Sequence, residues 1–247
     1  MIKEAIEKVL SLAGPTLFDE EGRRHVAIGG RIEAIRPPRV EPIVFASLTG
    51  LVEFILDADF GDPRTAGSFV HVVDHKEVVW LGSLHRAWQH REAFGIARFV
   101  AAREFPWEKQ LPQSEFITLV RQAFVWNEHV AAIVAVVGNV EGQSTVRLLD
   151  DGVTQEVTAR AGVARLANIA LPPVVHLAPY RSFPEAAQVE SPAFLRAWRD
   201  KNEQVLFSLH RVDDPTWQVE ARARVKAWMC RELDVTAEGE TCLAVIG

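Results

Sequence analysis

Residues that usually carry chemistry are scarce in this sequence. Its 247 residues include two cysteines, Cys230 and Cys242, which do not form a C-x-x-C pair. Two isolated cysteines indicate neither a disulfide framework nor a zinc knuckle, and they suit a reducing compartment. Tyrosine occurs once, against seven tryptophans. The candidates for function are therefore found among arginine, histidine and tryptophan.

Long apolar runs are also missing. Residues 1–14 carry too many charges around too short an apolar run for a signal peptide. No stretch of about 18 apolar residues, the length that spans a membrane, follows. We therefore expect a cytoplasmic protein that has no membrane partner.

The motifs of several common enzyme classes do not occur. The chain holds no G-x-x-x-x-G-K-[ST], G-x-G-x-x-G, G-x-S-x-G or H-E-x-x-H pattern. These patterns indicate a phosphate-binding loop, a dinucleotide fold, a nucleophile elbow and a zinc protease helix. We therefore expect a non-enzymatic protein that uses no cofactor.

The charge is mildly acidic, with 27 Lys and Arg against 33 Asp and Glu. Such a balance disfavours a protein that coats nucleic acid through non-specific, salt-driven contacts. The exception is the stretch from Gly22 to Val40, where five arginines stand against the single acid Glu33. These arginines are Arg23, Arg24, Arg31, Arg36 and Arg39. Two interpretations stay open: a solvated strand face, or a binding site for a phosphate-bearing ligand or nucleic acid.

The segment SFVHVVDHKEVVW, residues 68–80, holds the spacing H-x-x-D-H through His71, Asp74 and His75. Imidazoles four residues apart share a metal ion on a helix, where positions i and i+4 lie on one face. In a strand they lie about 13 Å apart along the backbone, too far for two ligands that are each about 2 Å from one zinc. The spacing indicates a metal site only if this segment is helical.

Valine content favours a strand here, because five of the thirteen residues are valine. We expect a hairpin with a four-residue turn over residues 74–77, which puts His71 opposite Trp80 and leaves His75 exposed. His85 and His90, five residues apart in LHRAWQHR, suit a solvated connection better than a ligand pair. A metal-dependent hydrolase that uses the histidines from 71 to 90 is the alternative.

Two of the tryptophans stand apart from the others. Trp88 and Trp107 lie in charged or proline-adjacent segments, and we interpret them as residues of a subunit or ligand interface. Most of the other tryptophans are expected in the core.

Turn residues between apolar runs indicate three further hairpins. TLFDEEGRRHVAI turns at its Glu-Gly step. STVRLLDDGVTQEVTA turns at Asp151-Gly152, which puts Arg147 opposite Glu156, a favourable charge pair. FLRAWRDKNEQVLFSLH turns near its Lys-Asn step and pairs Trp198 with Val205.

Apolar stripes at helical spacing predict five helices. The first covers residues 2–13, and the others begin at Ser47, Ser114, Asn127 and Thr216. The one after Asn127 is expected to be buried on most sides. Helices and hairpins in this order predict an α+β fold with antiparallel sheets. We expect one unit over residues 1–247, open to division into sublobes 1–110 and 140–247 joined by central helices at 113–138.

Several segments between residues 42 and 233 resemble uncharacterised bacteriophage and prophage proteins of the YfdQ-like kind, and relatives in phages of Gram-positive bacteria. The segments are FASLTGLVEFI, QSEFITLV, DDGVTQEVTARAGVA and LAPYRSF. The resemblance implies a phage-encoded protein in the cytoplasm of the host cell. It brings no activity and no catalytic residue to this chain.

Three hypotheses follow. The first is a non-enzymatic binding or assembly protein of a phage, a homo-oligomer that interferes with host defence or assists phage DNA metabolism. The second is the metal-dependent hydrolase. The third is a minor structural protein of the virion. Edge strands that invite pairing and the lack of catalytic motifs favour the first.

Overall fold

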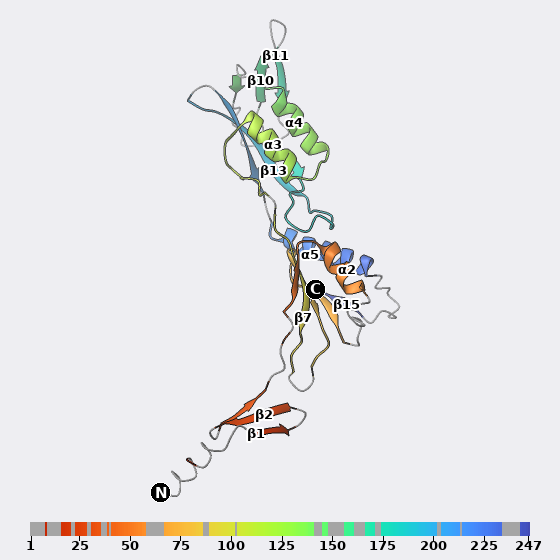
Figure 1. Cartoon of the computed structure of the whole chain (residues 1–247). Helices are drawn as coiled ribbons and strands as arrows, with labels where there is room; N and C mark the ends of the chain where they lie inside the picture. Colours follow the sequence, from red (N-terminus) through yellow and green to blue (C-terminus); the bar gives the residue numbers. More distant parts are fainter. Residues whose placement is uncertain are drawn as a thin grey trace.

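The molecule is elongated, and three groups of elements follow one another along it in the computed structural model (Figure 1). The structure describes residues 8, 16–20, 23–28, 31–35, 39, 41–57, 67–85, 89–101, 103–140, 145–147, 156–160, 166–170, 174–201, 204–212, 214–233 and 243–247. A small sheet near the N-terminus lies at one end, a central unit follows, and a distal unit lies beyond it.

The central unit contains a five-stranded sheet in the order β15-β5-β6-β7-β4. Its strands are β4 (Ile43–Phe45), β5 (Phe69–Val72), β6 (Glu77–Leu81), β7 (Ala93–Arg98) and β15 (Ala244–Ile246). Helices α2 (Leu48–Leu56) and α5 (Thr216–Glu232) pack against this sheet (Figure 1). Val70, Val72 and Val78 of the sheet are buried with Leu51 of α2 and Met229 of α5. Alternate valines therefore build the central core, as expected for strands with one covered face.

The distal unit contains a four-stranded sheet in the order β12-β13-β14-β8. Its strands are β8 (Leu111–Pro112), β12 (Val175–Leu177), β13 (Ser191–Arg199) and β14 (Val205–Arg211), and its helices are α3 (Gln113–Ala123) and α4 (Glu128–Gly138). Every second residue of β13 is buried, and Leu195 packs with Phe207 of β14 and Phe116 of α3. The central and distal units thus have separate hydrophobic cores.

Two three-stranded sheets complete the described fold. The N-terminal sheet has the order β1-β2-β3, and the sheet beside β13 has the order β11-β10-β9. Their strands are β1 (Thr16–Glu20), β2 (Arg23–Ile28), β3 (Arg31–Ala34), β9 (Thr145–Arg147), β10 (Glu156–Arg160) and β11 (Leu166–Ala170). All pairings within these two sheets are antiparallel.

The predicted α+β class is confirmed, with four helices among the described residues rather than five. The expected helix at 2–13 lies outside the described residues, apart from Lys8, which is helical. The central sheet is mixed, because both its edge strands, β4 and β15, pair in parallel with their neighbours. Division of the chain into sublobes stays a prediction; the helices at 113–138 belong to the distal core.

Register was predicted correctly for one hairpin and wrongly for two. Arg147 lies opposite Glu156, which confirms the register of β9 and β10. Trp198, however, lies opposite Leu206, so the prediction for β13 and β14 is wrong by one residue. The cause is Asp200, whose Oδ1 accepts a hydrogen bond from the Gln204 amide at 2.7 Å; Asp200 then pairs with Gln204, and the loop is one residue longer than predicted.

The H-x-x-D-H segment forms the predicted hairpin of β5 and β6, again with a register that differs by one residue. His71 lies opposite Val79, not Trp80. Asp74 Oδ1 accepts hydrogen bonds from the amides of Lys76 at 2.6 Å and Glu77 at 2.8 Å. These bonds draw Glu77 into the ladder, so the loop has three residues and not four.

Helix starts were predicted correctly where a side chain caps the helix. Ser47 accepts a hydrogen bond from the Gly50 amide at 3.1 Å, and Asn127 accepts one from the Val130 amide at 2.9 Å. The predicted cap at Thr216 is wrong, because Thr216 is itself the first residue of α5. The helix predicted to open at Ser114 begins one residue earlier, at Gln113.

Burial of α4 is also narrower than predicted. Its fully buried residues are Val130, Ile133 and Val137, which form one stripe, whereas Ala132 and Ala135 between them are exposed. Alanines made the segment look apolar on all sides, although the helix covers the distal sheet with a single face.

Candidate functional site

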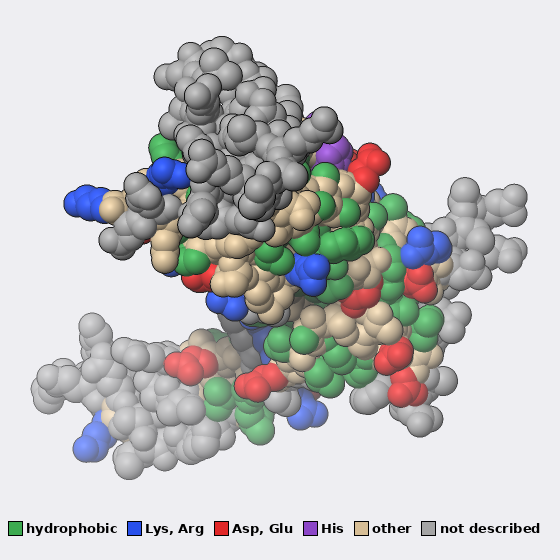
Figure 2. Space-filling view, turned by 90° about the horizontal axis from the view of Figure 1, so that it is seen from above, with side chains coloured by type: hydrophobic (Ala, Val, Ile, Leu, Met, Phe, Trp, Pro, Cys, Tyr) green, Lys and Arg blue, Asp and Glu red, His purple; other side chains and the backbone are tan. Residues whose placement is uncertain are grey.

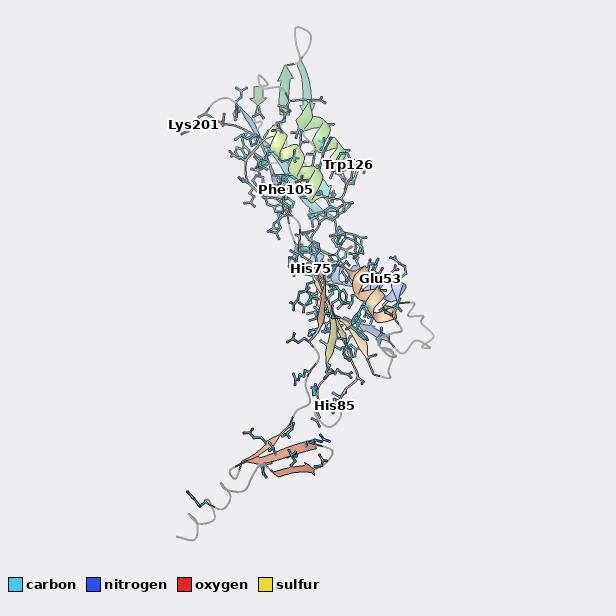
Figure 3. All side chains as sticks on the ribbon, in the orientation of Figure 1. Glu53, His75, His85, Phe105, Trp126 and Lys201 are labelled. Atoms are coloured by element: carbon cyan, nitrogen blue, oxygen red, sulfur yellow. The ribbon has the colours of Figure 1, made fainter. Side chains whose placement is uncertain are left out.

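A pocket lies where the central and distal units meet, and its volume is about 240 Å³. Residues of both units line it, together with residues of the chain segments that run between them. The lining residues are Lys76, Phe99, Ala101, Arg103, Glu104, Phe105, Trp107, Ala123, Pro179, Tyr180, Arg181, Arg211 and Trp217. Figure 3 marks the two sides of the junction by His75, next to the lining Lys76, and Phe105.

The wall on one side is the linking segment, residues 178–190. It is tied to the distal unit by the hydrogen bond from the Tyr180 amide to the Ala123 carbonyl, 3.0 Å. It is tied to the central unit by the Ser182 hydroxyl, which donates to the carbonyl oxygen of His75 at 2.7 Å. The segment therefore holds the two units together at the pocket.

A buried glutamine gives the linking segment its shape. The side-chain oxygen of Gln188 accepts hydrogen bonds from the amides of Arg181 and Ser182, both at 3.2 Å. Its side-chain nitrogen donates to the carbonyls of Phe183 at 2.8 Å and Ala186 at 3.0 Å. Backbone groups that would otherwise be buried without partners are thereby satisfied.

Positive charge dominates the lining. Four of the lining side chains are cations (Lys76, Arg103, Arg181 and Arg211), and one, Glu104, is an anion. Arg181 is held in place by its Nη2, which donates to the Ser191 hydroxyl at 2.7 Å. Its guanidinium carbon lies 3.9 Å from the ring centroid of Trp217, a cation–π contact. The site is suited to an anion.

Aromatic rings form most of the remaining lining. Trp107 packs edge-on against Phe105 at 5.4 Å and against Phe124 at 5.6 Å between ring centroids, and Phe105 is buried in the distal core. The next residue, Glu108, has a φ of 64°, a left-handed conformation that is uncommon outside glycine. Its amide donates to the Leu209 carbonyl at 2.8 Å, which fixes the turn that follows Trp107.

His75 lies behind the lining and not in solvent. Its ring is half-buried and meets the ring of Trp217 edge-on, with 4.8 Å between centroids, so the predicted exposure of His75 is wrong. Burial lowers the pKa of His75 below 6.5; Asp74 opposes this shift, while the charges of Lys76 and Arg181 add to it. The neutral imidazole is therefore favoured beside the pocket.

The structure places one predicted site residue, Trp107, in this pocket. Arg24 and Arg39 are exposed, and Arg24 Nε lies 4.0 Å from Asp19 Oδ1. Arg23 and Arg31 lie on β2 and β3 of the N-terminal sheet, at the end of the molecule beyond the central unit (Figure 1). Arg36 and Trp88 lie outside the described residues. Arg23, Arg24 and Arg31 of the N-terminal sheet and Trp107 of the pocket are therefore not brought together.

The histidines from 71 to 90 are spread along the central unit. His71 lies on β5 and His75 beside Trp217, whereas the rings of His85 and His90 stack with 5.6 Å between centroids. Within the described ranges, no group of three or more His, Cys, Asp and Glu side chains could hold a metal ion. The described geometry gives the hydrolase hypothesis no support.

The N-terminal sheet is a second surface of interest. Among the side chains described in β1–β3, none is buried. Leu17 and Ile32 are each 66% exposed, and Ile35, just after β3, is 40% exposed. Elsewhere, as Figure 2 shows from above, hydrophobic side chains are interspersed with charges of both signs.

Comparison of the chain with protein-family models, with curated proteins and with solved structures gave no match. In the part of the chain that the structure describes, no helix combines the length and apolar character needed to cross a lipid bilayer.

Proposed function

We propose that this protein is a non-enzymatic binding or assembly protein that works as a homo-oligomer. The observation that carries the proposal is the N-terminal sheet, whose described side chains are all exposed or half-buried. A small sheet needs a packed face for stability, because a few strands alone are only marginally stable in water. Among the described residues the sheet shows no buried face, and a second chain that packs against it would supply one.

A second copy of the same chain is the partner that we propose. The edge strand β1 ends with the acids Asp19 and Glu20, whereas the opposite edge strand β3 begins with Arg31 and also carries Glu33. A pairing of edges between copies that sets Arg31 beside these acids is favoured. Pairing of this kind also covers apolar residues such as Leu17 and Ile32, which are liabilities when exposed.

The biological setting rests on the resemblance to the YfdQ-like phage proteins. We infer a phage-encoded protein that acts in the cytoplasm of the host cell, on host defence or in support of phage DNA metabolism. A minor virion protein is the rival, and it is tested by mass spectrometry of purified particles of the encoding phage. Stoichiometric amounts of the chain in those particles would favour the rival.

Light scattering on the purified full chain tests the self-association. At micromolar concentration we expect a mass that is a multiple of 27.5 kDa. The double variant Leu17→Lys and Ile32→Lys should dissociate, because it places charge in the proposed interface. Val219→Lys is the matched control, since Val219 is 72% exposed on α5, far from the N-terminal sheet. A mass of 27.5 kDa for the unmodified chain across this range overturns the proposal.

A further inference from the structure

The pocket between the two units carries an inference that is independent of self-association. We propose that it binds a nucleoside phosphate unit, with the phosphate at the cations and the base against the aromatic rings. The unit is either a free nucleotide or the phosphorylated end of a nucleic-acid strand. These two sources share one chemistry.

The charge of the lining favours a phosphate group. The described lining side chains include four cations and one anion, in a chain whose formal net charge is −6. A phosphate monoester carries between about −1.5 and −2 near pH 7 and has several oxygens that accept hydrogen bonds from guanidinium groups. A lining in which cations outnumber anions therefore suits phosphate better than a monocarboxylate.

The side chain of Arg181 is preorganised for binding an anion. Arg181 is braced by the Ser191 hydroxyl at 2.7 Å and lies over Trp217, so its guanidinium plane is set before any ligand arrives. The segment that carries it is itself fixed by Gln188. A braced arginine loses little side-chain entropy when it binds an anion, which favours affinity.

Aromatic rings in the lining offer a surface on which a base can stack. Phe99, Trp107 and Tyr180 line the pocket beside the cations and are each at least partly accessible, whereas the ring of Trp217 already carries Arg181. Stacking of a base on such a ring strengthens binding and tolerates any base. Inorganic phosphate or a sugar phosphate would leave these rings unused. The combination of rings and cations points to a planar base that is linked to a phosphate.

Size limits the ligand to one unit. The pocket volume of about 240 Å³ lies below the usual range for drug-sized ligands, roughly 300–1,000 Å³. A single nucleotide can insert its base and phosphate, whereas a longer strand must leave its other nucleotides outside. The mildly acidic chain is consistent with recognition of one unit and not with coating of a strand.

Calorimetry with defined probes tests the proposal on the full chain. Adenosine 5′-monophosphate should bind with a stoichiometry of one per chain, and adenosine or inorganic phosphate alone should bind at least about tenfold more weakly, since each engages half of the site. Tryptophan fluorescence should change on binding, because Trp107 and Trp217 line the pocket. A 5′-phosphorylated oligonucleotide distinguishes the sources: tighter binding than the mononucleotide identifies a strand end, and equal or weaker binding identifies a free nucleotide.

Variants locate the binding in the pocket. Lys76→Gln and Arg103→Gln remove charge from exposed side chains and should leave the fold intact. Together the two changes should lower the affinity for adenosine monophosphate about tenfold and reduce the salt dependence of binding. Lys109→Gln is the control, because Lys109 is exposed nearby but does not line the pocket. No saturable binding of the mononucleotide or the oligonucleotide, or equal affinity in the double variant and the control, overturns the proposal.

Discussion

Glu185 caps the start of helix α2, although it lies 137 residues after Leu48, the first residue of that helix. Its Oε1 accepts hydrogen bonds from the amides of Leu48 at 2.8 Å and Thr49 at 3.3 Å, at the end of the helix where amides lack partners within it. The carboxylate also lies at the positive end of the helix dipole. The linking segment thus contributes to the stability of the central unit as well as to the pocket.

Removal of this cap should destabilise the protein. We expect Glu185→Ala to lower the free energy of unfolding by about 1–2 kcal/mol, because two helix amides lose a charged acceptor. Urea unfolding followed by circular dichroism measures the effect. Glu53→Ala on the exposed face of α2 is the control and should change stability by less than about 0.5 kcal/mol. Equal effects of the two changes would show that the cap contributes nothing.

Replacement of His75 should cost more than replacement of an exposed residue. An edge-on contact such as that between His75 and Trp217, with 4.8 Å between centroids, contributes about 1 kcal/mol. We therefore expect His75→Ala to lower the free energy of unfolding by about that amount at pH 8, where the imidazole is neutral in both states. A change below about 0.3 kcal/mol would contradict the contact.

The same residue should make stability depend on pH. The pKa of His75 is lowered from 6.5 in the folded protein, first by burial, so the unfolded chain takes up the proton at higher pH. Stability from the neutral ring is present above pH 6.5 and is lost as the pH falls below it. The loss in unfolding free energy between pH 8 and pH 5.5 should be smaller in His75→Gln than in the unmodified chain. An identical loss would contradict this role of His75.

Metal content tests the hydrolase alternative. Protein purified without a histidine tag should contain far less than one zinc, iron or manganese per chain by elemental analysis, because the H-x-x-D-H segment is a hairpin. Stoichiometric metal that disappears in His75→Ala would restore the alternative.

The arginines between Gly22 and Val40 remain a predicted anion site, and they compete with the pocket for that role. If the pocket holds the nucleotide, Arg23→Ala, Arg24→Ala and Arg31→Ala together should leave the affinity for adenosine monophosphate unchanged within about twofold. A loss of affinity with a flatter salt dependence would move the site to the N-terminal sheet.

Local signals in the sequence predicted local structure well. Ser47 and Asn127 cap their helices as expected, because a cap depends on residues within one turn. The two wrong registers share one cause, an aspartate at the start of the loop that bonds to the backbone beyond it. Asp74 and Asp200 were visible in the sequence, but the length of loop that each side chain stabilises was not.

The pocket could not have been predicted in the same way. Lys76, Arg103, Arg181 and Trp217 lie in four separate stretches of the chain and meet only because two units with separate cores pack end to end. Trp107 was singled out for its charged, proline-adjacent segment, but nothing in that segment indicates its partners. The contacts that assemble the pocket, such as that of Arg181 with Trp217, join segments far apart in the chain, and a pattern within one segment carries no information about them.

The arrangement of the two cores also sets the order in which the two units can fold during synthesis. The distal core is complete once residue 209 has been made, whereas the central core needs α5 and then Val245 of β15, which pairs with Val70. During synthesis, the central sheet therefore lacks its edge strand β15 at a stage when the distal unit can already fold. Proteolysis of nascent chains of increasing length should find the distal unit protected first. Protection of the central unit should follow only after β15 has emerged.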